Sequence, residues 1–583
     1  MKTKTFALLL AFVMLFAVFA GCGGTTASMS GTEASAEASE TASAPKEAPT
    51  EEMAAVPAET SVAETASAEE PAGPEYMDYE LPITTDSPEY QFLVGLNPGV
   101  SSFIEDFSEN QVISEWMSRT GIDVSFLSVH PSAAAENFNL LLAAEDLPDI
   151  TDNGLKYYNG STSSAIEDGI FADIMEYRDS CPNYMATVAE NDMIKKALLT
   201  DDGYMAAFYM LRKNNTSGEG MMIRQDWLDQ LGMDVPTTYD QVHDVLTAFK
   251  NQLGATSPML LNNSGTWSMG AFGWGYGMNG YMATDPVINL PLYVVDGQVK
   301  FAMMEDEYVD YLTMIAQWYK EGLIESDIEN VSAFQLAGDY IINDESGYFY
   351  TASTMISYYE FQAASERFAL TPAPQPLLHE GDKLCFSQAY DFQFEGAQAL
   401  AALNNWTVSA TAEDIETLIQ CLDYFYSPEG SLLANYGVEG VSFEYVDGVP
   451  TFTDLILAND EGMTVDNAIY IYTLQYGAFM EDYDRLNTTF TDVQRLCADT
   501  WTVEVEENYS YPMDFVSLTT DESETYSSVF NDISTVLAEN TLKFITGASS
   551  MDDYAAFQAQ LREMGIEQIV QIYQDAYDRF MAR

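Results

Sequence analysis

The sequence predicts an α/β protein in which a parallel sheet carries helices on both faces. Segments with the apolar patterns of strands alternate with segments whose apolar residues recur at helical spacing, and the connections between them are short. The apolar and aromatic fractions, 47% and 13%, are ample for a large core. A length of 583 residues suggests two to four domains or lobes.

The first elements follow the order strand, helix, strand, helix, strand. The expected strands cover residues 90–96, 122–129 and 146–150, and the expected helices cover 112–117 and 137–144. Gly121 is suited to end the first helix because glycine readily adopts the left-handed conformation. This order with short connections predicts neighbouring parallel strands.

Later segments continue the alternation. Thr238 is expected to begin a helix, with Gln241 at capping-box spacing, and Asp296-Gly297 and Asp447-Gly448 are expected to form tight hairpins between strands. Further amphipathic helices are expected over 308–319, 415–425 and 566–580. Trp116, Trp227 and Trp318 lie on helical patterns, which favours a place in the core, and Arg224 is expected to pair locally with Asp226.

The amino terminus indicates export. A short basic region is followed by an apolar stretch over residues 6–20, which as a helix would reach about 22 Å and so is short of a bilayer core of about 30 Å. It ends in Phe19-Ala20-Gly21-Cys22, which resembles a bacterial lipobox and implies removal of residues 1–21 and acylation of Cys22; a plain signal peptide with a chance cysteine is the alternative. Residues 22–87, rich in Ala, Ser, Glu and Pro, are predicted to form a disordered tether.

Charge and residue usage exclude several classes of function. With 22 Lys and Arg against 91 Asp and Glu, the net charge of −69 argues against nucleic-acid binding and against electrostatic attachment to anionic lipid. The same charge favours a neutral or cationic ligand over a polyanion. Three scattered His and five Cys form no metal-binding or catalytic pattern, so no cofactor, no metal and no catalytic residue is predicted. Cys181, Cys385, Cys421 and Cys497 are interpreted as buried thiols, although pairing remains open.

Short segments along the chain carry a family resemblance. The chain resembles the extracellular solute-binding lipoproteins of ATP-binding-cassette (ABC) importers, in particular the oligosaccharide-binding type related to the lipoproteins called LplA in Gram-positive bacteria. The segments are collinear from about residue 88 to residue 583: Leu140–Ile150, Cys181–Asn183, Asp202–Tyr204, Ile223–Gly232, Trp318–Ile324, Asn435–Gly440, Phe544–Gly547, Leu561–Gly565 and Tyr573–Arg579.

The resemblance implies a periplasmic-binding-protein-like fold of type II, with two lobes joined by hinge strands that close on a ligand. The first lobe is expected over 88–215 with 372–435, and the second over 219–370 with 436–583. The implied protein is a monomer with no enzymatic activity, held by its lipid at the extracellular face of the cell membrane. It would deliver an oligosaccharide to the permease subunits of an ABC transporter. A peptide or other small solute as ligand, or a cell-anchored glycosidase, are the alternatives.

Candidate ligand-binding residues combine aromatic rings, which can stack on sugar faces, with polar groups that can bind hydroxyls. Trp267, Trp274 and Tyr276 lie in a glycine-rich segment that favours close approach of a ligand. The other candidates follow strand-like segments or lie near expected turns: Asp152, Tyr157, Tyr158, Tyr350, Tyr390, Asp391, Trp406 and Glu439.

Overall fold

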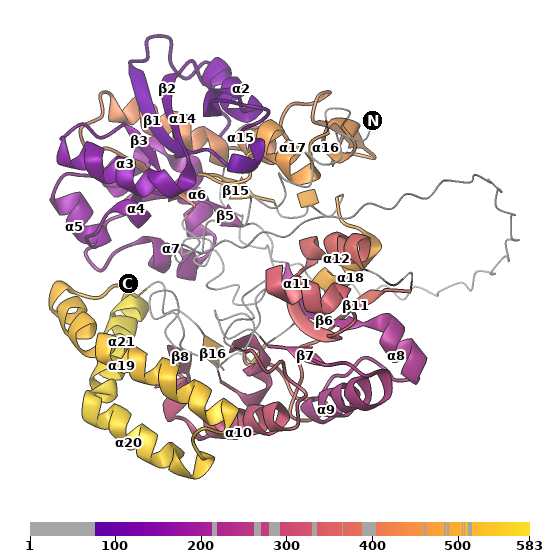
Figure 1. The fold of residues 1–583 in the computed structure, drawn as a ribbon. Helices are drawn as coiled ribbons and strands as arrows, with labels where there is room; N and C mark the ends of the chain where they lie inside the picture. Colours follow the sequence, from indigo (N-terminus) through magenta and orange to yellow (C-terminus); the bar gives the residue numbers. More distant parts are fainter. Residues whose placement is uncertain are drawn as a thin grey trace, which may run out of the picture. The chain divides into compact units, whose positions relative to one another are not determined.

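The computed structural model (Figure 1) describes residues 76–212, 218–261, 270–278, 292–328, 335–363, 365, 367–386, 404–459, 462–482, 485–486, 489–503, 505–506, 508–510 and 516–583. Contacts divide the chain into residues 1–73 and residues 74–583, and all described residues belong to the second of these units. Two main sheets organise the described part, and each is flanked by helices (Figure 1).

The first sheet has five strands in the order β2-β1-β3-β12-β4. The expected parallel arrangement of the first three strands is confirmed, because β1 runs parallel to both β2 and β3. The complete sheet is mixed and not parallel as predicted, because β12 returns from much later in the chain and pairs antiparallel with β3 and β4. The strands are β1 (Glu89–Gly95), β2 (Asp123–Val129), β3 (Ile150–Asp152), β4 (Ala207–Tyr209) and β12 (Asn405–Val408).

Helices around the first sheet begin and end at residues with clear local causes. Gly121, with φ of 79°, ends α2 as expected, and Pro131 begins α3 earlier than the apolar pattern suggested, with His130 as its cap. The Trp116 indole, fully buried, donates to the Cys421 carbonyl oxygen at 2.7 Å and joins α2 to α14. The helices are α2 (Gln111–Thr120), α3 (Pro131–Ala143), α4 (Gly154–Tyr157), α5 (Thr162–Glu167), α6 (Pro182–Ala189), α7 (Asp192–Leu198) and α14 (Ile415–Asp423).

Residues 428–481 contact the elements of the first sheet. Asn110, the cap of α2, donates to the carbonyl oxygens of Tyr470 and Thr473 at 2.6 and 2.9 Å, and β15 pairs parallel with β5. Most of this segment was expected in the second lobe, and the lobe boundaries stay a prediction. The elements are α15 (Pro428–Tyr436), β13 (Phe443–Val446), β14 (Val449–Phe452), α16 (Asp454–Leu457), α17 (Val465–Tyr472), β15 (Met480–Glu481) and β5 (Leu211–Arg212).

The second sheet has the order β11-β6-β10-β7, with only β10 and β7 parallel. The side chain of Arg224, at the end of β6, is 1% exposed and donates two hydrogen bonds to Asp226, at 2.8 and 2.7 Å. The expected local pair is therefore confirmed. Arg224 also donates to Asp344 at 2.6 Å. The elements here are β6 (Glu219–Arg224), α8 (Gln225–Leu231), α9 (Tyr239–Ala248), β7 (Met259–Leu260), α11 (Gln335–Ile342), β10 (Tyr348–Ala352), α12 (Ile356–Gln362), β11 (Leu370–Ala373) and α18 (Asp492–Trp501).

A small third sheet and the carboxyl-terminal helices complete the described fold. The hairpin of β8 and β9 turns at Asp296 and Gly297, which both have positive φ, and the same conformation at Asp447 and Gly448 joins β13 to β14, so both expected hairpins are confirmed. The remaining elements are β8 (Leu292–Val295), β9 (Gln298–Phe301), α10 (Asp306–Lys320), β16 (Tyr509–Ser510), α19 (Thr520–Thr546), α20 (Tyr554–Met564) and α21 (Ile566–Ala582).

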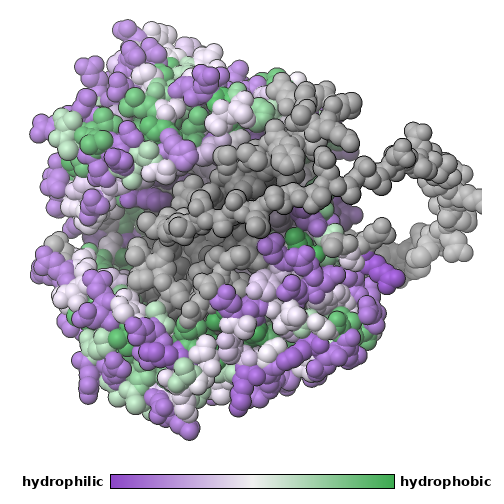
Figure 2. Space-filling view, viewed as in Figure 1, coloured by the Kyte–Doolittle hydropathy of each residue, from purple (hydrophilic) through white to green (hydrophobic). Residues whose placement is uncertain are grey.

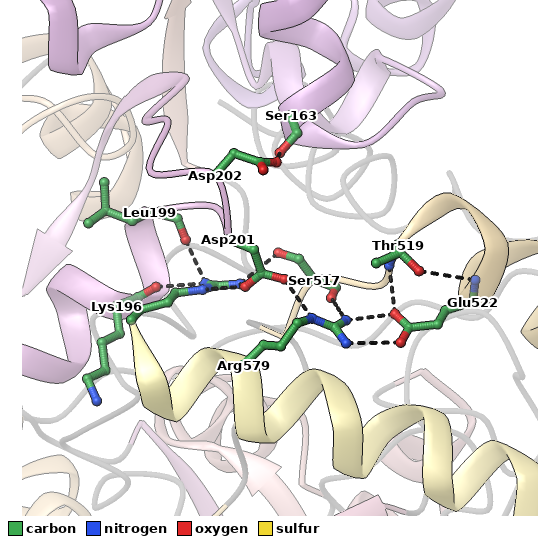
Figure 3. A network of polar contacts seen from close by, with 10 residues as sticks. Ser163, Lys196, Leu199, Asp201, Asp202, Ser517, Thr519, Glu522 and Arg579 are labelled. Atoms are coloured by element: carbon green, nitrogen blue, oxygen red, sulfur yellow. Dashed lines mark hydrogen bonds and ion pairs between the residues drawn. The ribbon is translucent and has the colours of Figure 1, made fainter.

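The last helix is tied to α19 and to the segment after α7 by arginines (Figure 3). Arg579 donates to Asp201 at 2.9 Å and to both carboxylate oxygens of Glu522 at 3.0 and 2.7 Å. Arg583 binds the other oxygen of Asp201 at 2.8 Å and the carbonyl oxygens of Lys196 and Leu199. Charge-assisted contacts of this kind fix α21 against both neighbours.

The core and the surface follow the expected division. Trp116, Trp227 and Trp318 are all buried, and the four described cysteines are buried free thiols, as the sequence predicts. On the face seen in Figure 2, hydrophilic residues dominate the described surface and apolar residues are scattered among them. In the described part of the chain, no helix combines the length and the apolarity needed to cross a bilayer.

Candidate functional site

A cavity of about 500 Å³ lies beside the first sheet, at the carboxyl ends of β1 and β3. We call it the first-sheet cavity. Parallel strands end together at this edge, so the residues that follow them converge, and ligands of open α/β sheets commonly bind at this place. The chain segments after α17 and before β12, the start of α3 and the residues just before α2 also line it. Residues that matter for its chemistry are Asn97, Asp152, Asn153, Lys156, Tyr157, Trp406, Tyr470 and Tyr476.

Asp152 is the acidic group of the first-sheet cavity. It ends β3 and lies directly opposite Trp406 in the antiparallel β3–β12 pair. Its carboxyl group accepts hydrogen bonds from the Trp406 indole, the backbone N–H of Gly95 and the amide of Asn153, the last at 3.1 Å. Burial raises the pKa of Asp152 to about 7, although these donors and Lys156 act in the opposite direction.

Trp406 shapes the cavity wall from within the core. It is 1% exposed, and its ring packs edge-on against Phe92 and Phe425 at 5.0 and 5.9 Å between centroids. The loop after α17 reaches the indole through Gly477, whose missing side chain leaves room for the ring. In this arrangement Trp406 orients the carboxyl group of Asp152, and little of its ring face is open for a ligand to stack on.

The two neighbouring tyrosines predicted to bind ligand separate in the structure. Tyr157 lines the first-sheet cavity, where burial and the nearby Asp152 raise its pKa to about 12. Tyr158 does not line it: its hydroxyl donates to Asp168 at 3.2 Å and its ring packs on Phe171. Successive residues at the end of α4 point in different directions, so only one of the pair reaches the cavity.

Several cavity residues were not predicted from the sequence. Asn153 follows Asp152 in the left-handed conformation, and its amide oxygen is buried with no hydrogen-bond partner among the described residues. Tyr470 accepts from the backbone N–H of Asn97 at 3.2 Å, and Tyr476, 50% exposed, offers an aromatic face at the rim. Position after a strand could have indicated Asn153, whereas nothing local marks the two tyrosines.

A second cavity of about 210 Å³ lies at the second sheet, and we call it the second-sheet cavity. Tyr350, from β10, and Trp274 line it, and their role in ligand binding stays a prediction; Trp501, which was not predicted from the sequence, lines it as well. Trp501 covers β6 by lying against Gly220 and donating to the Met221 carbonyl oxygen at 3.1 Å. The Tyr350 hydroxyl and the Gln375 amide oxygen are buried without a hydrogen-bond partner among the described residues.

The other predicted residues lie elsewhere. Tyr276 is half-buried between Tyr239 and Tyr311, and its hydroxyl donates to the Met314 sulfur at 3.3 Å. Glu439 is exposed in the turn after α15. Neither lines a cavity described above. The predictions on Cys22, Trp267, Tyr390 and Asp391 concern positions outside the described residues.

Known proteins resemble this chain over most of its length. No family model matches the sequence. Lipoprotein LipO of Bacillus subtilis is 24% identical over 353 residues, which cover 58% of this chain and 64% of LipO. The polygalacturonan/rhamnogalacturonan-binding protein YtcQ of the same organism is 34% identical over 137 residues, or 23% of this chain and 25% of YtcQ. The matches thus span less than two thirds of each relative.

Solved structures match more completely. The alginate-binding protein AlgQ2 superposes with a TM-score of 0.61 at 21% identity, over 85% of this chain and 99% of AlgQ2. The chain has the fold of solute-binding proteins. A second such protein, the HMO-binding solute-binding protein of Bifidobacterium longum infantis, matches with a TM-score of 0.63 at 19% identity, over 85% of this chain and 99% of that one. The α/β, two-lobe solute-binding fold predicted from the sequence is confirmed.

Within this solute-binding fold, the described part of the chain contains no cluster of three or more His, Cys, Asp or Glu side chains suited to a metal ion. The two cavities instead combine aromatic rings with hydrogen-bond acceptors and donors. Such an arrangement can bind a polar organic ligand by stacking and hydrogen bonding.

Proposed function

We propose that this chain is a lipid-anchored extracellular solute-binding protein that captures an oligosaccharide and delivers it to the permease subunits of an ABC transporter. The first-sheet cavity carries the proposal: aromatic rings and hydrogen-bonding groups line it at the edge of the sheet where ligands of α/β folds bind. The names of YtcQ, AlgQ2 and the HMO-binding protein support a carbohydrate as the ligand class.

The chemistry of the cavity suits a sugar. A sugar ring has apolar C–H faces, which stack on aromatic rings, and hydroxyls, which both donate and accept hydrogen bonds. Tyr157 and Tyr476 supply rings, while Asp152 and Asn153 supply acceptors. The proposed ligand-binding set also keeps the other residues predicted from the sequence, except Tyr158, whose ring lies outside this cavity: Trp267, Trp274, Tyr276, Tyr350, Asp391, Trp406 and Glu439.

Delivery requires a membrane location and two conformations. Acylation of Cys22 would anchor the protein, in line with the name lipoprotein given to LipO, and residues 22–87 would act as the tether. Closure of the two proposed lobes around the sugar would produce the form that the permease recognises. In this role the protein acts as a monomer and changes no bond of its ligand.

Isothermal titration calorimetry against a panel of oligosaccharides tests the proposal, with a matched pair of variants. Tyr157→Ala removes a ring from the first-sheet cavity, whereas Tyr158→Ala removes the neighbouring ring outside it. We expect a sugar that binds with micromolar or tighter affinity, a loss of at least about tenfold, or 1.4 kcal/mol, in Tyr157→Ala, and a change below about twofold in Tyr158→Ala. Equal losses in both variants would remove this cavity from the proposal.

The alternatives give different results in the same experiment. Binding of a peptide library with no response to any sugar would assign the fold to peptide capture. Release of shorter products after prolonged incubation with a bound oligosaccharide would instead indicate a glycosidase.

A further inference from the structure

Both cavities present hydrogen-bond acceptors that lack donors. The Asn153 amide oxygen and the Gln375 amide oxygen are buried without partners among the described residues. The orientation of Asn153 is set by its own contacts, because its NH₂ group donates to Asp152 at 3.1 Å and its oxygen must therefore face away from that carboxylate. A buried acceptor of this kind is stabilised by a ligand that donates.

Carboxylates add to these acceptors. Asp152 lines the first-sheet cavity, and Glu219 and Asp382 line the second-sheet cavity. Ionised carboxylates accept hydrogen bonds and cannot donate them, and Asp152, whose pKa is raised to about 7, takes this form above neutral pH, where the sugars are to be compared. Among the described lining residues, each cavity has a single cation, Lys156 or Lys383, and Lys156 already acts on Asp152.

A sugar with free hydroxyls and a sugar with acid groups therefore interact differently with the residues that line these cavities. Hydroxyls can donate to Asp152, to Asn153 and to Gln375. The carboxylate of a uronic acid only accepts, and it would face like charges in a poorly solvated space, where such repulsion is strongest. The net charge of −69 acts in the same direction at longer range.

Resting on the proposed function, we infer that the ligand is an uncharged oligosaccharide whose hydroxyls donate to Asp152, Asn153 and Gln375, and that these acceptors exclude uronic-acid oligosaccharides. This chain then differs in ligand charge from YtcQ and AlgQ2, whose names give polygalacturonan and alginate as ligands. Asp152 is the specificity-determining residue in this scheme because it is the only carboxylate among the described lining residues of the larger cavity.

The test compares sugars of equal length that differ in charge. Calorimetry of the wild-type protein uses neutral gluco-, manno-, galacto- and fructo-oligosaccharides, and it adds tetragalacturonate together with its methyl ester, in which esterification removes the charge and keeps the sugar backbone. We expect binding by a neutral sugar, and binding of tetragalacturonate at least 100-fold weaker than that of the tightest neutral sugar. The methyl ester should bind more tightly than the acid.

The variant Asp152→Asn separates charge from shape, since the amide is close to isosteric with the carboxyl group. It should reduce the discrimination between the tightest neutral sugar and tetragalacturonate by at least tenfold, while thermal unfolding confirms that the variant is folded. Uronide binding as tight as neutral-sugar binding in the wild-type protein, or discrimination unchanged in Asp152→Asn, overturns the inference and leaves the proposed function intact. No binding of any sugar by the folded wild-type protein overturns the proposed function itself.

Discussion

Gly477 should be intolerant of even the smallest side chain. It is buried with φ of 129°, in a region of backbone conformation that residues with a Cβ rarely adopt. A Cβ placed there would lie 2.6 Å from Cζ2 and 3.0 Å from Cε2 of Trp406. Gly477→Ala therefore combines backbone strain with a collision against a ring that is 1% exposed.

The two costs can be separated. Positive φ costs a residue with a Cβ about 1–2 kcal/mol. Carbon atoms in contact sit about 3.5–4.0 Å apart, so the indole must move by about 1 Å, and forcing such a shift in a packed core costs about 1–3 kcal/mol more. We therefore expect Gly477→Ala to lower the free energy of unfolding by about 2–5 kcal/mol. Because the displaced indole donates to Asp152, ligand affinity should fall as well.

Gly448→Ala is the matched control. Gly448 also has positive φ, 85°, but nothing lies within 4 Å of its would-be Cβ. Urea unfolding followed by tryptophan fluorescence should show a loss of only about 1–2 kcal/mol for the control. A loss of stability in Gly477→Ala no larger than that in Gly448→Ala would refute the predicted collision with Trp406.

Three further predictions concern buried charge and thiols. Arg224→Lys should lower the free energy of unfolding, measured by urea titration, by about 2–4 kcal/mol. An ammonium group cannot replace both contacts to Asp226 together with the contact to Asp344. A loss below about 0.5 kcal/mol, which is the size expected for an exposed ion pair, would contradict this prediction. Asp152 is ordinarily half-protonated at pH 3.8 and in the folded protein at about 7, so between these values the native state binds the proton more tightly than the unfolded chain. The contribution of this group to stability therefore falls as pH rises through that window, and the difference in melting temperature between wild type and Asp152→Asn should change with pH there and be flat above pH 8. Burial raises the thiol pKa of Cys421 and Cys497 to about 12 and raises the thiol pKa of Cys181 and Cys385 as well. In a variant without Cys22, an aromatic disulfide reagent should therefore label the native protein slowly and the unfolded protein at four sites. Rapid native labelling would show that these thiols are accessible.

Elements with strong local signals could be predicted from the sequence. The end of α2 at Gly121, the Asp447-Gly448 hairpin and the amphipathic helix α21 depend on residues a few positions apart, so their patterns are complete within short windows. The direction of β12 could not be predicted. It depends on which distant strands it meets, and residues 405–408 contain no information about that choice.

The candidate site was predicted in part for the same reason. Asp152 and Tyr157 follow a strand, and position after a strand is a local signal. Trp406 lies opposite Asp152 only because β12 pairs with β3, and Tyr470 and Tyr476 approach only because α17 packs on the cap of α2. Tyr157 and Tyr158 differ in the direction of their side chains, and two adjacent tyrosines in a sequence do not show which of them points toward the cavity.

The placement of β12 has a consequence for biogenesis. Its neighbours β3 and β4 are translated long before it, yet they do not pair with each other and meet only through this late strand. Pairings between residues so remote in the chain form slowly. A polypeptide leaving the ribosome amino terminus first must therefore keep this half-built layer open until residues 405–408 emerge. Its unpaired strand edges are exposed to chaperones during that delay.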